Sequence, residues 1–239
     1  MTNPYKESIA FQVSPSTKTV GFWSAVLATV FSITYIVGQF AEWLGLLGSQ
    51  GGPASGSTPL GLVVLLTPSL FLASSFLMLC VSIYQLTPSD RKIWSHAAVV
   101  FATIYAALIS IVYFVQLTLV APRVARGQIE GIEVFLFVPF DSFLYAVDIL
   151  GYSFMSMATL FAAQVFTGRG LHRVVRLFLI ANGLLLPFIA LQMYFHSLIW
   201  VAALWAVTFP GSMWTLAIFF RRAITTATVP SSLVNEIQE

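Results

Sequence analysis

Six long apolar runs alternate with short polar connections along this chain. They occupy residues 20–46, 60–85, 93–120, 142–166, 175–195 and 198–220. Each run reaches the length of about 20 apolar residues that a helix needs to cross a bilayer. The last two runs share one apolar block, from Leu177 to Phe220, that contains no Asp, Glu, Lys or Arg and is too long for a single helix. We therefore predict six membrane-spanning helices, with the turn between the last two near His196.

The composition agrees with a protein that folds in lipid. Of the 239 residues, 58% are hydrophobic and 8% are charged. A soluble domain carries roughly a quarter charged residues, so lipid is the favoured solvent. The net charge of +2 does not indicate a nucleic-acid partner. The predicted fold class is an all-α, polytopic integral membrane bundle with one domain over residues 20–222 and polar tails at residues 1–19 and 223–239.

Basic residues predict the orientation of the chain. Nine of them lie in the two tails and in the second and fourth connections, whereas only Arg123 and Arg126 lie in the other connections. Lys and Arg accumulate on the cytoplasmic side of membrane proteins. We therefore predict that both termini are cytoplasmic and that the protein resides in the plasma (inner) membrane. The nine residues are Lys6, Lys18, Arg91, Lys92, Arg169, Arg173, Arg176, Arg221 and Arg222.

Two acidic residues, Glu42 and Asp148, fall inside predicted spans. Glu42 lies near the outer end of the first span, and Asp148 lies roughly 10 Å into the fourth at 1.5 Å per residue. Apart from Arg176, at the very start of the fifth, no Lys or Arg lies within a predicted span to pair with either acid. Such residues are costly in a membrane and are usually functional, and burial without a counter-charge favours the neutral carboxyl. The alternative is a structural role, in which polar groups hold helices together.

Helical spacing places further polar and aromatic residues beside these acids. Tyr145 and Tyr152 share one helix face with Asp148, and Tyr35 and Gln39 share another with Glu42. We predict a polar and aromatic pocket that opens outward, with Asp148 and Glu42 as candidate catalytic acids. The other candidate ligand-binding residues lie at a similar depth and are Tyr113, Gln116, Gln192 and His196.

Two outward connections and two prolines add detail. Residues 45–59 are rich in Gly and Ser, which predicts a flexible loop. Residues 121–141 end in an apolar stretch, 134–140, that either rests on the membrane surface or folds back as a lid. Pro68 and Pro187 lie in the second span of each three-helix half, a position where inverted-repeat transporters have broken helices. The sequences around the two prolines do not resemble each other.

Several chemistries lack their residues in this sequence. No predicted span contains a lysine for a retinal Schiff base, no histidines cluster as metal ligands, and no phosphate-binding loop is present. We therefore predict no cofactor and no metal site. The favoured function is binding of, or acid/base chemistry on, a small lipophilic molecule. The alternatives are a proton-coupled transporter or channel, and an accessory or scaffold subunit with a partner membrane subunit or a second copy of itself. Whether the protein is an enzyme stays open.

Overall fold

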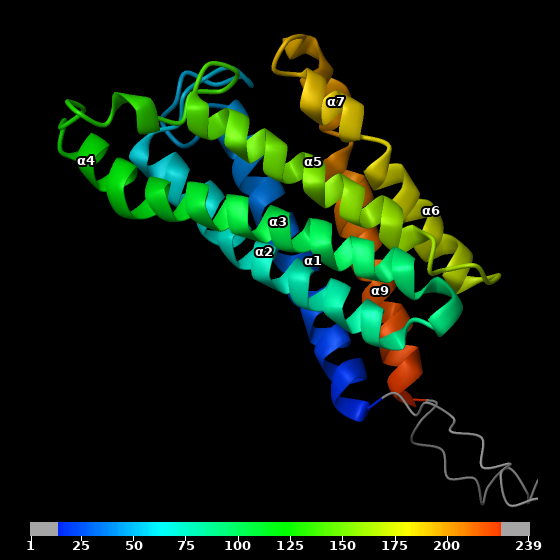
Figure 1. The fold of residues 1–239 in the computed structure, drawn as a ribbon. Helices are drawn as coiled ribbons and strands as arrows, with labels where there is room; N and C mark the ends of the chain where they lie inside the picture. The colour runs from blue at the N-terminus through cyan, green and yellow to red at the C-terminus, as the bar shows by residue number, and fades with distance from the viewer. Residues whose placement is uncertain (1–13, 226–239) are drawn as a thin grey trace, which may run out of the picture.

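The computed structural model describes residues 14–225 (Figure 1). Within that range every regular element is helical. Six helical segments are long and apolar enough to cross a membrane. This confirms the prediction of an all-α protein with six spans. Most of the two predicted tails, residues 1–19 and 223–239, lies outside the described residues, as does Lys6.

Four of the six spans are built on one long helix each. These are α1 (Pro15–Trp43), α2 (Pro59–Leu86), α3 (Lys92–Val115) and α5 (Phe143–Ala163). The first span was predicted to begin at residue 20, where the apolar run starts. Helix α1 begins earlier, at Pro15, and its first turn was not recognised because it is polar. The Ser14 hydroxyl accepts a hydrogen bond from the backbone N–H of Ser16 at 3.3 Å, and Pro15 occupies the first helical position.

The third span continues beyond α3 without a break. A π-helical turn, Gln116–Val120, leads directly into α4 (Ala121–Ala125). The N–H of Ala121 bonds the carbonyl oxygen of Gln116, five residues back, as a π-helix requires. Residues 121–125 were predicted to belong to a connection, and they extend the helix instead.

The fifth and sixth spans are each interrupted once. The fifth consists of α6 (Leu171–Gly183) and α7 (Leu186–Leu191), and the sixth of α8 (Ile199–Ala202) and α9 (Trp205–Thr225). The two predicted spans are therefore present, each with a single interruption. The turn between the spans occupies residues 192–195, directly before the predicted position at His196.

The two prolines of the inverted-repeat hypothesis behave differently. Pro187 lies in the first turn of α7, where a missing N–H leaves no hydrogen bond unmade, and the break precedes it. Pro68 lies inside the continuous helix α2. The two halves therefore do not share a broken second helix.

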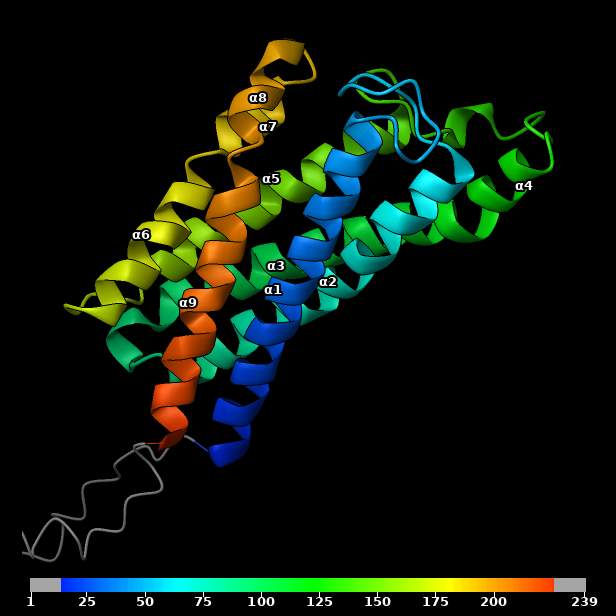
Figure 2. The same ribbon diagram turned by 180° about the vertical axis from the view of Figure 1, so that it is seen from behind.

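The six spans form a closed ring in chain order. Helix α1 contacts α2, α2 contacts α3, α3 contacts α5, α5 contacts α6, α6 contacts α9, and α9 returns to α1 (Figures 1 and 2). The start of α1 and the end of α9 lie at the same end of the bundle (Figure 1). The guanidinium of Arg91, after α2, donates to the hydroxyl of Thr167, after α5, so these two basic connections also lie together. We call the opposite end, with connections 44–58 and 126–142, the distal end.

Helix α1 has its small residues on the buried face and large apolar residues on the exposed face, as is typical of helices in lipid. Ala25, Ala28 and Ser32 are buried, while Val30 and Val37 are exposed. Lipid is as apolar as these valines, so large apolar side chains gain little from turning inward, and small ones allow neighbouring helices to approach closely. The closest approach is at Gly21, where an added Cβ would lie 2.2 Å from Cε1 of Phe220 in α9.

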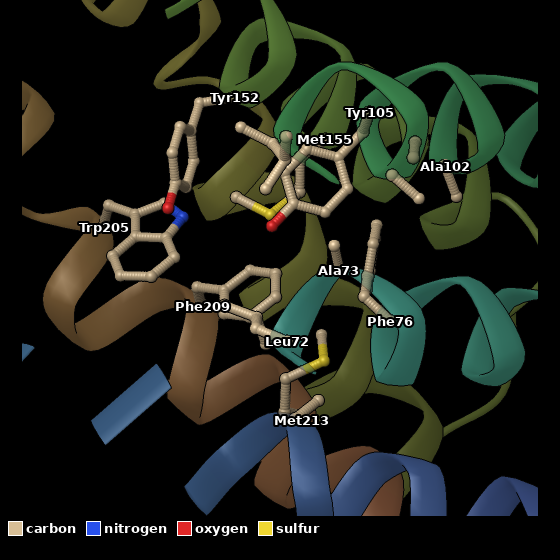
Figure 3. Close-up of a cluster of buried hydrophobic side chains, with 14 of the residues drawn as sticks. Leu72, Ala73, Phe76, Ala102, Tyr105, Tyr152, Met155, Trp205, Phe209 and Met213 are labelled. Carbon is tan, nitrogen blue, oxygen red and sulfur yellow. The ribbon is translucent and has the colours of Figure 1, made fainter. Parts of the chain in front are cut away.

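A polar contact joins three other spans in the bundle interior. The side-chain amide of Asn182 in α6 donates to the Thr159 hydroxyl of α5 at 3.1 Å. The Thr208 hydroxyl of α9 donates to Oδ1 of Asn182, also at 3.1 Å. Below the distal end the interior is filled by buried side chains such as Phe76, Phe209 and Met213 (Figure 3).

Replacing Gly21 with valine should weaken the contact between α1 and α9. The new Cβ would collide with the buried ring of Phe220. Overfilling an interior contact typically costs about 1–3 kcal/mol. We therefore expect a lower midpoint of thermal unfolding in detergent. The control is Gly56→Ala, at an exposed glycine whose added Cβ would meet nothing within 4 Å. Equal midpoints for the two variants would show that close approach at Gly21 does not hold the ring.

The predicted orientation can be measured with single cysteines. The only cysteine, Cys80, is buried and should not react with a membrane-impermeant maleimide. Ala54 at the distal end and Ser89 at the opposite end are both exposed. In intact cells we expect labelling of Ala54→Cys, and labelling of Ser89→Cys only after permeabilisation. The reverse pattern would place the termini outside.

Candidate functional site

A cavity of about 170 Å³ lies in the distal half of the bundle. Side chains from all six spans and from both distal connections line it. Most of them are apolar or aromatic, and the polar ones come mainly from α1 and α5. The cavity therefore has the mixed lining, apolar walls with a few polar groups, that is typical of sites for small ligands.

The first distal connection, residues 44–58, covers part of this cavity. The backbone N–H of Gly52 donates to the carbonyl of Trp43 at 2.8 Å, and the Thr58 hydroxyl donates to the carbonyl of Leu47 at 2.7 Å. Gly51 has a φ of +79°, and a Cβ there would lie 3.0 Å from the Trp43 oxygen, so glycine is required. This sequence was predicted to be a flexible loop. Its hydrogen bonds fold it back on α1 and bring Ser55 to the cavity.

The second distal connection contributes a lid. Phe137 and Pro139 line the cavity. The Gln116 side-chain amide donates to the carbonyl oxygen of Phe135 at 2.6 Å, which ties this segment to the π-helical turn. The ring of Phe140 stacks on His196 with centroids 4.3 Å apart. Of the two alternatives for residues 134–140, the structure has the segment folded over the cavity.

Asp148 and Glu42 both line the cavity, and both are unpaired. Asp148 is 5% exposed and Glu42 is 2% exposed. Oδ1 of Asp148 and both carboxyl oxygens of Glu42 are buried without a hydrogen-bond partner in the described part of the chain. A Cβ on Gly61 would lie 2.6 Å from Oε2 of Glu42. Gly61 is in the first turn of α2, whose positive dipole end favours a carboxylate. Asp148 has no comparable neighbour.

Tyrosine hydroxyls connect α1, α3 and α5 around Asp148. The Tyr35 hydroxyl donates to Oε1 of Gln39 at 3.0 Å, and the hydroxyls of Tyr113 and Tyr152 lie 3.1 Å apart. Asp148 lines the same cavity as these tyrosines and lies one helical turn before Tyr152 on α5. The hydroxyls therefore form the polar surroundings of the carboxyl.

Trp205, at the start of α9, forms the aromatic centre of the cavity. Its ring meets Tyr35 at 5.7 Å and 90°, and Tyr152 at 5.7 Å and 88°. On another side Trp205 stacks on Phe209 at 5.0 Å and 13° (Figure 3). Its Nε1 is buried without a hydrogen-bond partner among residues 14–225. The cavity is thus walled by rings set at right angles to one another.

Most of the residues chosen from the sequence meet at this cavity. Eight of the ten line it, and their roles as ligands or catalytic groups stay predictions. The other two do not line it: Gln116 holds the lid, and His196 is exposed and stacks on Phe140. The eight are Tyr35, Gln39, Glu42, Tyr113, Tyr145, Asp148, Tyr152 and Gln192.

Sequence reasoning missed Trp205 and left open whether Phe137 and Pro139, in the stretch 134–140, reach the site. Trp205 carries a usable signal, because it lies five residues beyond the exposed Trp200 and therefore deeper than an interfacial tryptophan. The contribution of Phe137 carries none, because it depends on the fold of the connection. No group of three metal-ligating side chains occurs within residues 14–225. No protein-family model, curated protein or solved structure matches the chain.

Replacing Gln116 with leucine should loosen the lid. The change leaves the carbonyl oxygen of Phe135 without its donor, at a cost of about 1 kcal/mol, or a factor of about five. We expect backbone amides of residues 134–140 to exchange hydrogen faster by that factor. The matched control is Gln85→Leu, at an exposed glutamine at the other end of the bundle. Unchanged exchange in Gln116→Leu would show that this hydrogen bond does not fasten the lid.

Proposed function

We propose that this membrane protein binds a small lipophilic molecule in the distal cavity, with Asp148 as its polar anchor. The observation that carries this proposal is an unpaired carboxyl oxygen, buried in a cavity whose walls are mainly apolar and aromatic. A buried polar atom without a partner costs about 1–3 kcal/mol. A ligand that fills the cavity and hydrogen-bonds Asp148 removes that cost.

The same geometry suits acid/base chemistry on the bound molecule. A general acid or base must lie within hydrogen-bonding reach of the proton that it transfers. Asp148 lines the cavity and is buried, so a molecule bound there would lie beside its carboxyl, and Tyr113 lines the same cavity. Asp148 and Glu42 are therefore the candidate catalytic residues, with Asp148 foremost because Glu42 already faces the first turn of α2.

A lipophilic molecule can reach the cavity from the bilayer. Phe40 lines the cavity and is also 49% exposed on the outer surface of α1. Next to it Trp43 meets Trp200 edge to face, with ring centroids 5.6 Å apart. Ile199 of α8 lines the same side. This arrangement supports entry between α1 and α8. The opening there is bounded by the aromatic rings of Trp43 and Trp200 rather than by hydrogen-bonded backbone.

Proton-coupled transport is a second candidate, because the fifth and sixth spans are both interrupted and the break in the sixth lies at the cavity, which Ala203 and Trp205 line. Discontinuous helices commonly surround transporter sites. Beneath Trp205, however, the bundle interior is filled by Phe209, Phe76 and Met213, so a path to the other side requires rearrangement (Figure 3). Proton flux in reconstituted vesicles that disappears in Asp148→Asn would favour this candidate.

The proposal predicts a specific small molecule in purified protein. Extraction of protein prepared in mild detergent, followed by mass spectrometry, should yield this molecule from the unmodified chain. Asp148→Asn should retain about tenfold less, because a hydrogen bond to a charged group contributes about 1.5–3 kcal/mol. The matched control is Asp141→Asn, an exposed acid at the other edge of the lid, which should retain the full amount.

Bulk phospholipid alone in all three samples would contradict the proposal. Equal amounts of the specific molecule in Asp148→Asn and in the unmodified chain would contradict the role of Asp148. A second membrane protein that co-purifies, with no small molecule, would favour an accessory subunit.

A further inference from the structure

We propose that the ligand is a lipophilic organic cation, with an amine or quaternary ammonium group held between Asp148 and the rings of Tyr35, Tyr152 and Trp205. This inference rests on the proposed function, since it names the chemical class of the molecule that the distal cavity binds. Three independent features of the cavity point to it: the sign of its charge, the geometry of its rings and the placement of its carboxyls.

The cavity is lined by two acids and by no Lys, Arg or His among the described residues. The nearest basic side chains at the distal end have other contacts. Arg123 donates to the carbonyl of Glu130 at 2.9 Å, and Arg126 donates to the side chain of Gln128 at 3.1 Å. A buried carboxyl without a partner is neutral, whereas a cation beside it favours the charged form. No such cation lines the cavity among the described residues, so a positive partner for Asp148 would come from outside the chain.

The rings have the arrangement that surrounds a rounded cation. Tyr35 and Tyr152 each stand at right angles to Trp205, at 90° and 88°. One side of Trp205 is covered by Phe209, which stacks on it nearly parallel, so the tyrosines and the cavity take the others (Figure 3). The face of an aromatic ring is electron-rich and attracts ammonium groups, most strongly for Trp. Rings in different planes can present their faces to such a group from more than one side.

Asp148 and Glu42 have different roles in binding the cation. Asp148 is held among tyrosine hydroxyls beside these rings, and so supplies the direct counter-charge. Glu42 packs against Gly61 in the first turn of α2 and contributes a second negative charge on the same cavity. An anionic ligand would meet two acids, and a neutral apolar one would leave Asp148 unpaired. A neutral ligand with a hydroxyl could hydrogen-bond Asp148 but would gain no charge attraction from the carboxyls or the ring faces. A cation gains from both.

The test compares two probes of the same shape that differ in charge. Benzyltrimethylammonium carries a quaternary nitrogen where its uncharged isostere, neopentylbenzene, has a carbon. The full chain is placed in nanodiscs of zwitterionic lipid, and binding is followed by tryptophan fluorescence, because Trp43 and Trp205 line the cavity. We expect the cation to bind at least about tenfold more tightly than the isostere.

Variants separate the charge from the cavity. Asp148→Asn should weaken the cation by about tenfold and change the affinity of the isostere by less than about twofold. Glu42→Gln, which keeps the shape of the side chain, should weaken the cation by a smaller factor because this acid is farther from the rings. Asp141→Asn serves as the exposed control and should bind both probes like the unmodified chain.

Three outcomes would overturn the inference. Equal affinity of the unmodified chain for the two probes would leave a lipophilic site and exclude selection for charge. Unchanged cation affinity in both Asp148→Asn and Glu42→Gln would remove the carboxyls from recognition. Binding of neither probe would overturn both this inference and the use of the cavity as a ligand site.

Discussion

The close approach of α1 to its neighbours is the contact on which the rest of the structure depends. In lipid, large apolar side chains gain little from burial, so helices associate where small residues let them touch. At one end of α1, Gly21 brings it against Phe220 of α9 and closes the ring. Farther along, Gly38 keeps α1 close to α2, where an added Cβ would lie 3.2 Å from Cγ1 of Val64, while Tyr35, Gln39 and Glu42 line the distal cavity. The same helix therefore combines close contact with its neighbours and the polar side chains of the cavity.

The two halves of the bundle therefore serve different purposes. The half near the termini is filled by interlocking aromatic and sulfur-containing side chains, which give the cavity a rigid floor (Figure 3). The distal half has short helices, α7 and α8, and two connections fastened by hydrogen bonds. Such segments contribute fewer buried contacts and open at lower cost than long helices. A stiff base beneath a more easily opened cover is a reasonable arrangement for a molecule that must admit a ligand and still hold it in one orientation.

Hydropathy and helical spacing predicted the parts of this structure that depend on one helix at a time. The six spans follow from apolar length, and the shared face of Tyr145, Asp148 and Tyr152 follows from steps of three and four residues. The helix breaks could not be predicted from hydropathy. Residues 184–185, for example, lie in an apolar stretch in which the average hydropathy gives no sign of a break. The tie between Gln116 and Phe135 was also out of reach, because it joins segments whose relative placement only the folded chain defines.

The π-helical turn at Gln116–Val120 has a consequence for the geometry of the whole third span. One hydrogen bond that skips an additional residue acts like a single-residue insertion, and it shifts the angular phase of everything after it by about 100°. Tyr113, before the shift, faces the cavity, and Arg123, after it, reaches across to the lid connection. The shift changes the direction that α4 and the connection after it take relative to the face of α3 on which Tyr113 lies. The third span thus combines two helical phases, one that belongs to the bundle and one that belongs to its cover.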